Sequence, residues 1–255
     1  MILGGHPVFY WVGHFDWEQK KFLADKEEGT LLDLTNPFHC YNPLCVDDKG
    51  ENGAPRRLLM ALFRDIAVCD PDAVPALWYC THAQPRVLTL QDDHLRQDPI
   101  PELEVRRNSE WSREQVIVSD GETVLADAQG NCVEISARFA PAQTGRCGVR
   151  LLVSDKAEET VRVWYDAATD QFGIDGGVRF AGQGPAYNPV GESVELRIFV
   201  DRQLIEVFVN GQSCTTAAIT ATPSGTGIAL LAEGTSALCE KWTIWRMDEA
   251  EQPIR

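Results

Sequence analysis

The sequence predicts an all-β protein built from antiparallel strands. At 194–214, VELRIFVDRQLIEVFVNGQSC, two runs rich in Val, Ile and Phe flank a polar turn. After residue 115, several short runs of β-branched and aromatic residues alternate with Gly, Asp, Asn and Pro. Nearer the N-terminus lie further apolar runs of strand length, beginning with PVFYWVGHF at 7–15. Short strands separated by turn residues are typical of an antiparallel sandwich.

The stretch 194–214 predicts a β-hairpin with its turn at 201–203. A strand places alternate residues on the same face. Each arm of the hairpin therefore has one apolar face, made by Leu196, Ile198 and Val200 in the first arm and by Ile205, Val207 and Val209 in the second. Glu206 and Phe208 point to the opposite side. Asn210-Gly211 supplies the next turn.

The first part of the chain predicts further strands in order. We expect 7–15 to form one buried strand, Phe22-Leu23 a short second strand, and 31–33 the start of a third. The charged segment DDKGENG at 47–53 predicts a turn. RRLLMALF at 56–63 predicts a buried strand that returns from it, with an amphipathic helix as the alternative because Leu, Met and Ala favour helices.

The charged segment EVRRNSEWSREQ at 104–115 predicts a linker or a short helix. Trp164, Trp242 and Trp245 lie in strand-like runs, where we expect core or interface packing rather than ligand stacking. Besides the hairpin, the strands expected after this segment are 116–118, 121–125, 132–139, 148–154, 160–165, 177–180, 227–231 and 241–245.

The hairpin closely resembles a signature of glycoside hydrolase family 32, the invertase, fructanase and sucrose-6-phosphate hydrolase family. In the β-sandwich that ends those enzymes the pattern is L-R-I-F-V-D-x-S-x-I-E-V-F-x-N-x-G. The matching residues here are Leu196, Arg197, Ile198, Phe199, Val200, Asp201, Ile205, Glu206, Val207, Phe208 and Asn210.

The preceding segments resemble, in the correct order, the last part of that family's five-bladed propeller. The family has D-x-G-x-D-F-Y-A where this chain has DLTNPFHC at 33–40, so that Pro37 and His39 replace an acid and a tyrosine. This departure puts any substrate contact of the segment in doubt. The matching segments are YWVGHFD at 10–16, Leu32-Asp33 with Phe38, RRLL at 56–59, Trp78 with PRVLTL at 85–90, and LRQDPIPEL at 95–103.

The resemblance implies a remnant of a five-bladed β-propeller followed by a C-terminal antiparallel β-sandwich. The expected domains are the incomplete propeller at 1–107 and the sandwich at 108–255. The activity implied is hydrolysis of the β-fructofuranosidic bond of sucrose or a fructan, without a metal or an organic cofactor.

The catalytic motifs of that family do not occur in this sequence. Retaining glycosidases use two carboxyl groups, which the family places in W-M-N-D-P-N-G and E-C motifs, with a further Asp in R-D-P. The nearest mimics are Arg64-Asp65-Ile66, which comes too late in the order, and Cys239-Glu240, which is reversed. We expect Asp65 to cap a turn and Glu240 to be solvated. The sequence therefore predicts no catalytic residue.

Other kinds of site also lack their spacing, so no metal-binding or cofactor-binding residue is predicted. The segment PSGTG at 223–227 is not a nucleophile elbow, and the glycine-rich 173–184 lacks the lysine of a phosphate-binding loop. The eight cysteines contain no C-x-x-C pair. The histidines that lack the spacing of a metal site are His6, His14, His39, His82 and His94.

A formal net charge of −15 argues against a nucleic-acid partner. No apolar run is long enough to cross a bilayer, and no basic region follows Met1, so we expect no membrane partner and a cytoplasmic location. We expect the cysteines to be buried free thiols. Disulfides in a secreted protein are the alternative.

Two hypotheses of function follow. In the first, the chain is the C-terminal portion of a family 32 hydrolase, inactive alone because one blade cannot close a propeller. It would meet sucrose or fructan only when completed by the missing propeller, and the sandwich could contact a second copy or a complementing chain. In the second, the chain is a standalone β-sandwich module for sugar binding or oligomerisation.

Overall fold

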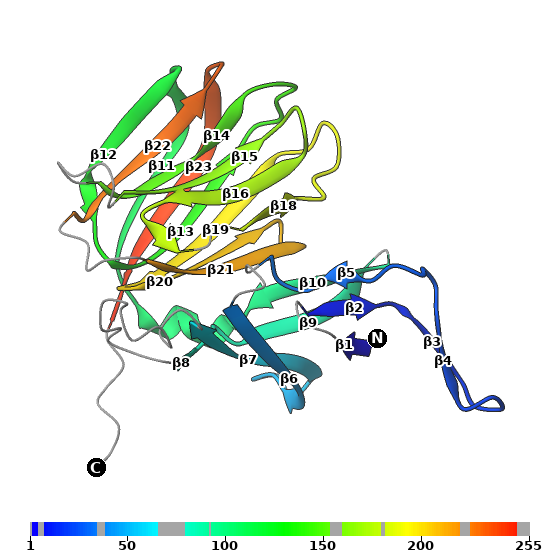
Figure 1. Ribbon diagram of the computed structural model, residues 1–255. Coiled ribbons are helices and arrows are strands. Elements are labelled where there is room, and N and C mark those ends of the chain that lie inside the picture. The colour runs from blue at the N-terminus through cyan, green and yellow to red at the C-terminus, as the bar shows by residue number, and fades with distance from the viewer. Residues whose placement is uncertain are drawn as a thin grey trace, which may run out of the picture.

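The computed structural model describes residues 2–4, 8–34, 39–65, 80–91, 93–153, 160–179, 182–219 and 225–248. In these residues the chain forms antiparallel β-sheets and one short 3-10 helix, which confirms the all-β prediction. Figure 1 shows a two-layered sandwich and, below it, the smaller sheets of the N-terminal part. The predicted matches at Phe38 and Trp78, and the departure at Pro37, lie outside the described residues.

The sandwich consists of one seven-stranded and one six-stranded sheet. The first has the order β11 (Arg107–Val118), β23 (Ala237–Met247), β13 (Cys132–Phe139), β19 (Val194–Asp201), β20 (Leu204–Val209), β21 (Ser213–Ile219) and β17 (Val178–Arg179). The second has the order β12 (Gly121–Gln129), β22 (Gly227–Glu233), β14 (Arg146–Val153), β15 (Val161–Asp166), β16 (Gln171–Gly176) and β18 (Gln183–Pro185).

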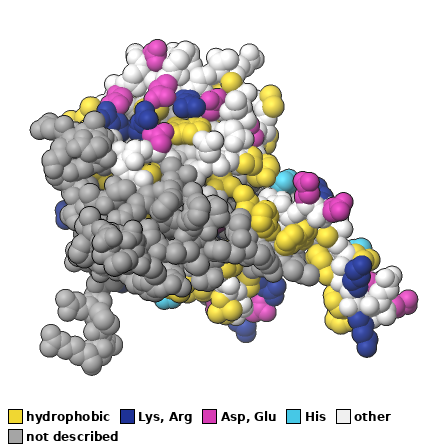
Figure 2. Space-filling model, in the orientation of Figure 1, with side chains coloured by type: hydrophobic (Ala, Val, Ile, Leu, Met, Phe, Trp, Pro, Cys, Tyr) yellow, Lys and Arg dark blue, Asp and Glu magenta, His cyan; other side chains and the backbone are white. Residues whose placement is uncertain are grey.

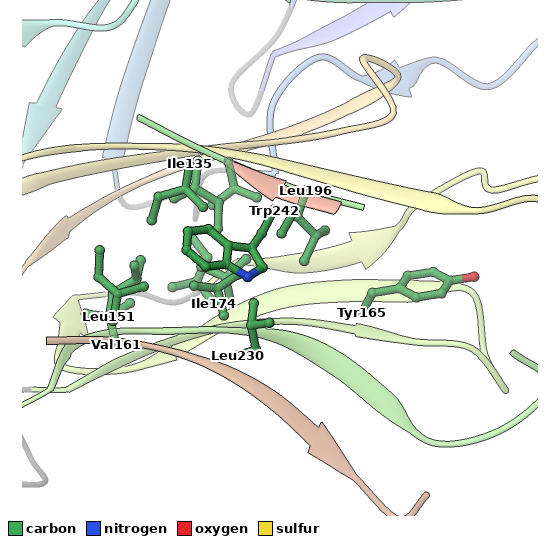
Figure 3. Packing of buried hydrophobic residues seen from close by; sticks show 14 of the residues in the cluster. Ile135, Leu151, Val161, Tyr165, Ile174, Leu196, Leu230 and Trp242 are labelled. Carbon is green, nitrogen blue, oxygen red and sulfur yellow. The ribbon is translucent and has the colours of Figure 1, made fainter. Parts of the chain in front are cut away.

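The main hydrophobic core fills the space between these two sheets. Alternating residues of each strand point inward, so that Ile135 and Leu196 of one sheet face Leu151 and Leu230 of the other. Trp242 of β23 lies between the layers (Figure 3) and is only 4% exposed. This confirms the prediction that Trp242 is a core residue.

The predicted hairpin is confirmed as β19 and β20. Ile198 pairs with Val207, and both lie in the main core. Arg202 makes the turn with a φ of 54°. Glu206 and Phe208 are buried on the opposite face, as the alternation predicted, and that face is covered by the N-terminal sheets.

The N-terminal part contains three small sheets. β1 (Ile2–Gly4), β2 (Phe9–Trp11) and β5 (Thr30–Leu31) form the first, and β3 (Gly13–Asp16) with β4 (Lys21–Ala24) forms a separate hairpin that projects from the body (Figure 1). The third has the order β10 (His94–Pro99), β9 (Arg86–Gln91), β7 (Pro55–Asp65) and β6 (His39–Lys49), and β8 (Cys80–His82) pairs with β7.

Two predictions about the N-terminal strands were wrong. Residues 7–15 do not form one strand. The chain leaves the first sheet after Trp11 and enters the β3–β4 hairpin at Gly13, which lies against the backbone of Leu23. The 47–53 turn is also shorter than expected, since β6 continues to Lys49. The predicted strand at 56–63 is confirmed within β7, and the helical alternative is wrong.

The linker predicted at 104–115 is in fact mostly strand. The 3-10 helix η2 (Pro101–Arg106) supplies the short helix, and β11 then begins at Arg107 as the edge of the larger sheet. Its charged residues lie at the exposed edge, which is why the segment resembles a linker in sequence. The strands β16 and β18 were not predicted, because their sequences contain glycine and few β-branched residues.

A second core joins the N-terminal sheets to the sandwich. Leu59, Leu88 and Leu95 of the five-stranded sheet pack in one cluster with Leu204 and Ala218 of the sandwich. No helix in the described part of the chain is both long and apolar enough to span a bilayer.

Candidate functional site

A group of buried charged side chains lies where the N-terminal sheets meet β20 and β21. At its centre is Arg86 of β9, whose side chain is 0% exposed. Its Nη2 donates to Asp33 Oδ2 at 2.8 Å and to Glu206 Oε2 at 3.2 Å. The carboxylates come from opposite sides of the junction, since Asp33 follows β5 and Glu206 belongs to β20. One guanidinium therefore links the two parts of the chain.

Further hydrogen bonds fix each carboxylate in place. Thr216 of β21 donates to Asp33 from its backbone N–H and from its Oγ1, both at 3.1 Å. The backbone N–H of Gln84 donates to Glu206 Oε1 at 2.7 Å. Each carboxylate is thus held by donors from the opposite part of the chain. These bonds fix the position of the N-terminal sheets on the sandwich.

Gln97 of β10 binds the other terminal nitrogen of the Arg86 guanidinium. Its Oε1 accepts from Arg86 Nη1 at 3.0 Å, and its Nε2 donates to the carbonyl of Leu32 at 2.7 Å. The guanidinium also lies 5.0 Å from the ring centre of Phe208, where the aromatic face stabilises a cation.

The junction holds two carboxyl groups against one arginine. Burial raises the pKa of Glu206 above its ordinary value, and the nearby Asp33 charge adds to the rise, while Arg86 and the Gln84 N–H oppose it. Burial also raises the pKa of Cys214 on β21. The thiol is therefore an unreactive neutral group at this position.

A second buried acid lies nearby in the sandwich sheet. Glu134 of β13 is 0% exposed and accepts hydrogen bonds from Arg107 Nε and Nη2 at 2.8 and 2.7 Å, and from Arg197 Nε at 2.8 Å. Arg107 also lies 3.9 Å from the ring centre of Trp245. This cluster ties the start of β11 to β13 and β19.

Neither cluster has the geometry of a glycosidase site. A retaining enzyme places two carboxyl groups on either side of a bond in the substrate, whereas the side chains of Asp33 and Glu206 are 1% and 2% exposed. Within the described residues no group of His, Cys, Asp and Glu could hold a metal ion. The junction is therefore a structural site that positions the N-terminal sheets on the sandwich.

The residues considered from sequence are dispersed. Glu240 is not simply solvated, as expected, since its Oε2 accepts from Arg138 Nε at 2.9 Å and from Ser193 Oγ at 3.0 Å. Asp65 ends β7, and its side chain lies outside the described part. His14 and His82 are exposed. The charged residues of the junction were not recognised as a site from the sequence.

One face of the five-stranded sheet is open to solvent and largely apolar. Leu44 and Val46 of β6 point to this face and are 64% and 40% exposed. A separate groove of about 950 Å³ lies at the end of the β6–β7 hairpin, and its lining includes Arg57, Val87 and Leu95 but neither Leu44 nor Val46. Figure 2 shows further hydrophobic side chains along the side that leads to the β3–β4 hairpin.

Comparison with known proteins gives a consistent family signal. Residues 102–246 match the family model described as "Glycosyl hydrolases family 32 C terminal". A levanase from Bacillus subtilis is 27% identical over 252 residues, which cover 91% of this chain and 36% of the levanase. A sucrose-6-phosphate hydrolase from Zymomonas mobilis is 28% identical over 136 residues, covering 52% of this chain and 26% of that enzyme.

Solved structures share the fold. The exo-inulinase from Aspergillus awamori has a TM-score of 0.77 at 20% identity, covering 95% of this chain and 50% of the inulinase. The fructan 1-exohydrolase IIa from Cichorium intybus has a TM-score of 0.76 at 15% identity, with 96% and 56% coverage. The chain thus spans about a third of the levanase and about half of these solved enzymes.

Proposed function

Because the chain belongs to glycoside hydrolase family 32, we propose that it is the C-terminal part of a β-fructofuranosidase-type hydrolase of sucrose or fructans. The catalytic carboxylates would come from propeller blades that this sequence does not contain, so the chain is inactive by itself. The collinear match to the levanase carries this proposal. It runs through almost the whole of this chain but only about a third of the relative.

The open face of the five-stranded sheet supports the same role. The blades of a propeller pack face to face around an axis, and an isolated blade leaves such a face exposed. Leu44 and Val46 lie on this face, beside Leu58 and Met60 of the neighbouring strand with which they pair. We infer that the missing blades cover these side chains, whether they belong to the same polypeptide or to a complementing chain.

The junction supplies the rigidity that this arrangement needs. Arg86, Asp33 and Glu206 hold the N-terminal sheets on the sandwich, so that the sandwich acts as the base for the last blade. In this proposal residues 1–107 are the propeller portion and residues 108–255 are the sandwich.

Association with the missing blades gives a direct test. We would mix the 255-residue chain with the propeller of a family 32 relative made without its last blade and sandwich, and measure complex formation by sedimentation velocity. The wild-type chain should form a one-to-one complex. Changing Leu44→Asp and Val46→Asp together should abolish it, because two charges would enter an apolar interface.

A matched control separates this effect from loss of folding. Val190→Asp, at a fully exposed position of the sandwich, should leave the complex intact. Both variants should retain the thermal stability of the wild-type chain, since all three side chains are exposed in it. A complex that survives the double substitution, or the lack of any complex with the wild-type chain, would contradict the proposal.

A further inference from the structure

A groove opens between the two sheets of the sandwich, at the edge formed by β11 and β12. In the described part of the chain each of these strands lies at one end of its sheet. The groove has a volume of about 390 Å³, within the range of about 300–1,000 Å³ that is usual for small-molecule sites. Val116 and Leu125 line it together with two tryptophans, Trp111 and Trp242.

Trp242, one of the residues that line the groove, carries a buried hydrogen-bond donor. Among the described residues no acceptor lies within reach of its Nε1, although the residue is only 4% exposed. Figure 3 shows the ring between the layers, with its nitrogen directed toward the sheet that carries Leu230. That sheet also contains β12, the other wall of the groove. Buried tryptophan N–H groups normally have a partner, so this N–H is available to an acceptor that enters the groove.

The mouth of the groove is polar and carries both signs of charge. Trp111 and Arg113 of β11 pair with Ile244 and Trp242, which face the core, so both point toward the space between the sheets. Arg113 Nη2 lies 3.5 Å from Asp127 Oδ2 of β12. This ion pair spans the opening from one sheet to the other and remains largely exposed, so a ligand could bind both groups.

The ligand that suits this lining has apolar faces and several hydroxyl groups. Its ring would lie against Trp111, and one of its oxygens would accept from Trp242 Nε1. Its hydroxyl groups would donate to Asp127 and accept from Arg113. We propose that the groove between β11 and β12 binds one ring of a neutral sugar.

Two other occupants fit the structure less well. The charges of Arg113 and Asp127 cancel, so the mouth offers no net attraction for an anion or a cation. A β-strand of another chain would have to pair with β11, whose edge carries Glu110, Arg113 and Glu114. Charged residues at an edge strand oppose such pairing. The site lies within the sandwich and does not depend on the proposed catalytic role.

The indole N–H signals of the seven tryptophans provide a direct test. We would record ¹H–¹⁵N spectra of the full chain, assign Trp242 and Trp245 by Trp→Phe substitution, and titrate with D-fructose, D-glucose and sucrose. The Trp242 signal should shift and saturate with at least one sugar. The Trp245 signal should not shift, because its Nε1 already donates to Glu110 Oε2 at 2.9 Å.

Substitutions at the mouth locate the binding site. Asp127→Ala should weaken the affinity by about tenfold or more, the loss expected for a hydrogen bond to a charged group. Glu114→Ala is the matched control, because Glu114 pairs with Lys241 instead, at 3.3 Å, and is similarly exposed. It should leave the affinity unchanged. A Trp242 signal that stays still with all three sugars, or equal affinities in both variants, would overturn the proposal.

Discussion

Replacing Arg86 by methionine tests whether the buried junction holds the chain together. Methionine keeps an unbranched apolar stem at this position but removes the guanidinium. Asp33 and Glu206 would then share a buried space without a counter-charge. Removing one partner of a buried ion pair commonly costs about 3–5 kcal/mol, because the remaining charge is left uncompensated.

We expect the loss of stability in Arg86→Met to stay within this range, because both carboxylates keep other hydrogen-bond donors. Asp33 keeps two donors from Thr216, and Glu206 keeps the Gln84 N–H. Replacing Glu206 by a neutral residue would remove one of the two uncompensated charges, so it should restore part of the lost stability. We expect the Arg86→Met, Glu206→Gln double variant to be more stable than Arg86→Met alone, which is the coupling expected of residues that share one network.

Urea denaturation and hydrogen exchange would measure these effects. Arg86→Met should lower the unfolding free energy by about 3–5 kcal/mol and speed exchange of the amides of Gln84 and Thr216, which donate to the two carboxylates. Arg57→Ala is the control, because Arg57 forms an exposed pair with Asp47 and such pairs contribute little. Equal, small effects of both substitutions would refute the idea that the junction stabilises the chain.

Three further predictions follow from the buried groups. The pKa of Glu206 is raised in the folded chain. Its contribution to stability is therefore present at low pH and is lost as the pH rises above the ordinary glutamate value of about 4.3. Glu206→Gln should flatten this pH dependence of the unfolding free energy, measured by denaturation at a series of pH values. Burial raises the pKa values of Cys147 and Cys239 to about 12. Peptide mapping after alkylation at neutral pH should find both unmodified in the native chain, under conditions in which the half-buried Cys132 reacts. Phe139→Ala, at a position with 0% exposure, should cost about 3–5 kcal/mol in urea denaturation.

The sandwich hairpin could be predicted from sequence because its signals are local. The alternation of Ile205, Glu206, Val207 and Phe208 fixes which side chains share a face. The register then follows from the short turn. The structure confirms both, with Ile198 opposite Val207.

The missed elements have weak or misleading local signals. β11 begins with charged residues that resemble a linker, and only pairing with β23 makes it a strand. At Asp47 and Asp48 the chain is polar enough for a turn, yet both residues lie in β6 and pair with Arg57 and Arg56 across the hairpin. Cross-strand partners, which the sequence alone does not reveal, decide these cases.

The junction could not be predicted from the sequence for a related reason. Arg86 is 53 residues from Asp33 and 120 residues from Glu206, so no spacing links them. One signal was present, since Glu206 is a charged residue in the middle of an apolar strand. A buried acid needs a partner, and this requirement alone could have prompted a search for an arginine.

The most direct test of the proposed function is hydrolysis of sucrose and inulin, measured as release of fructose. The purified chain would be assayed alone and then mixed with a family 32 propeller that lacks its last blade and sandwich. We expect no activity from the chain alone and activity in the mixture, lost when the propeller's catalytic carboxylates are replaced. Hydrolysis by the chain alone, abolished by substitution of one of its own carboxylates, would contradict the account, as would a complex that forms but remains inactive.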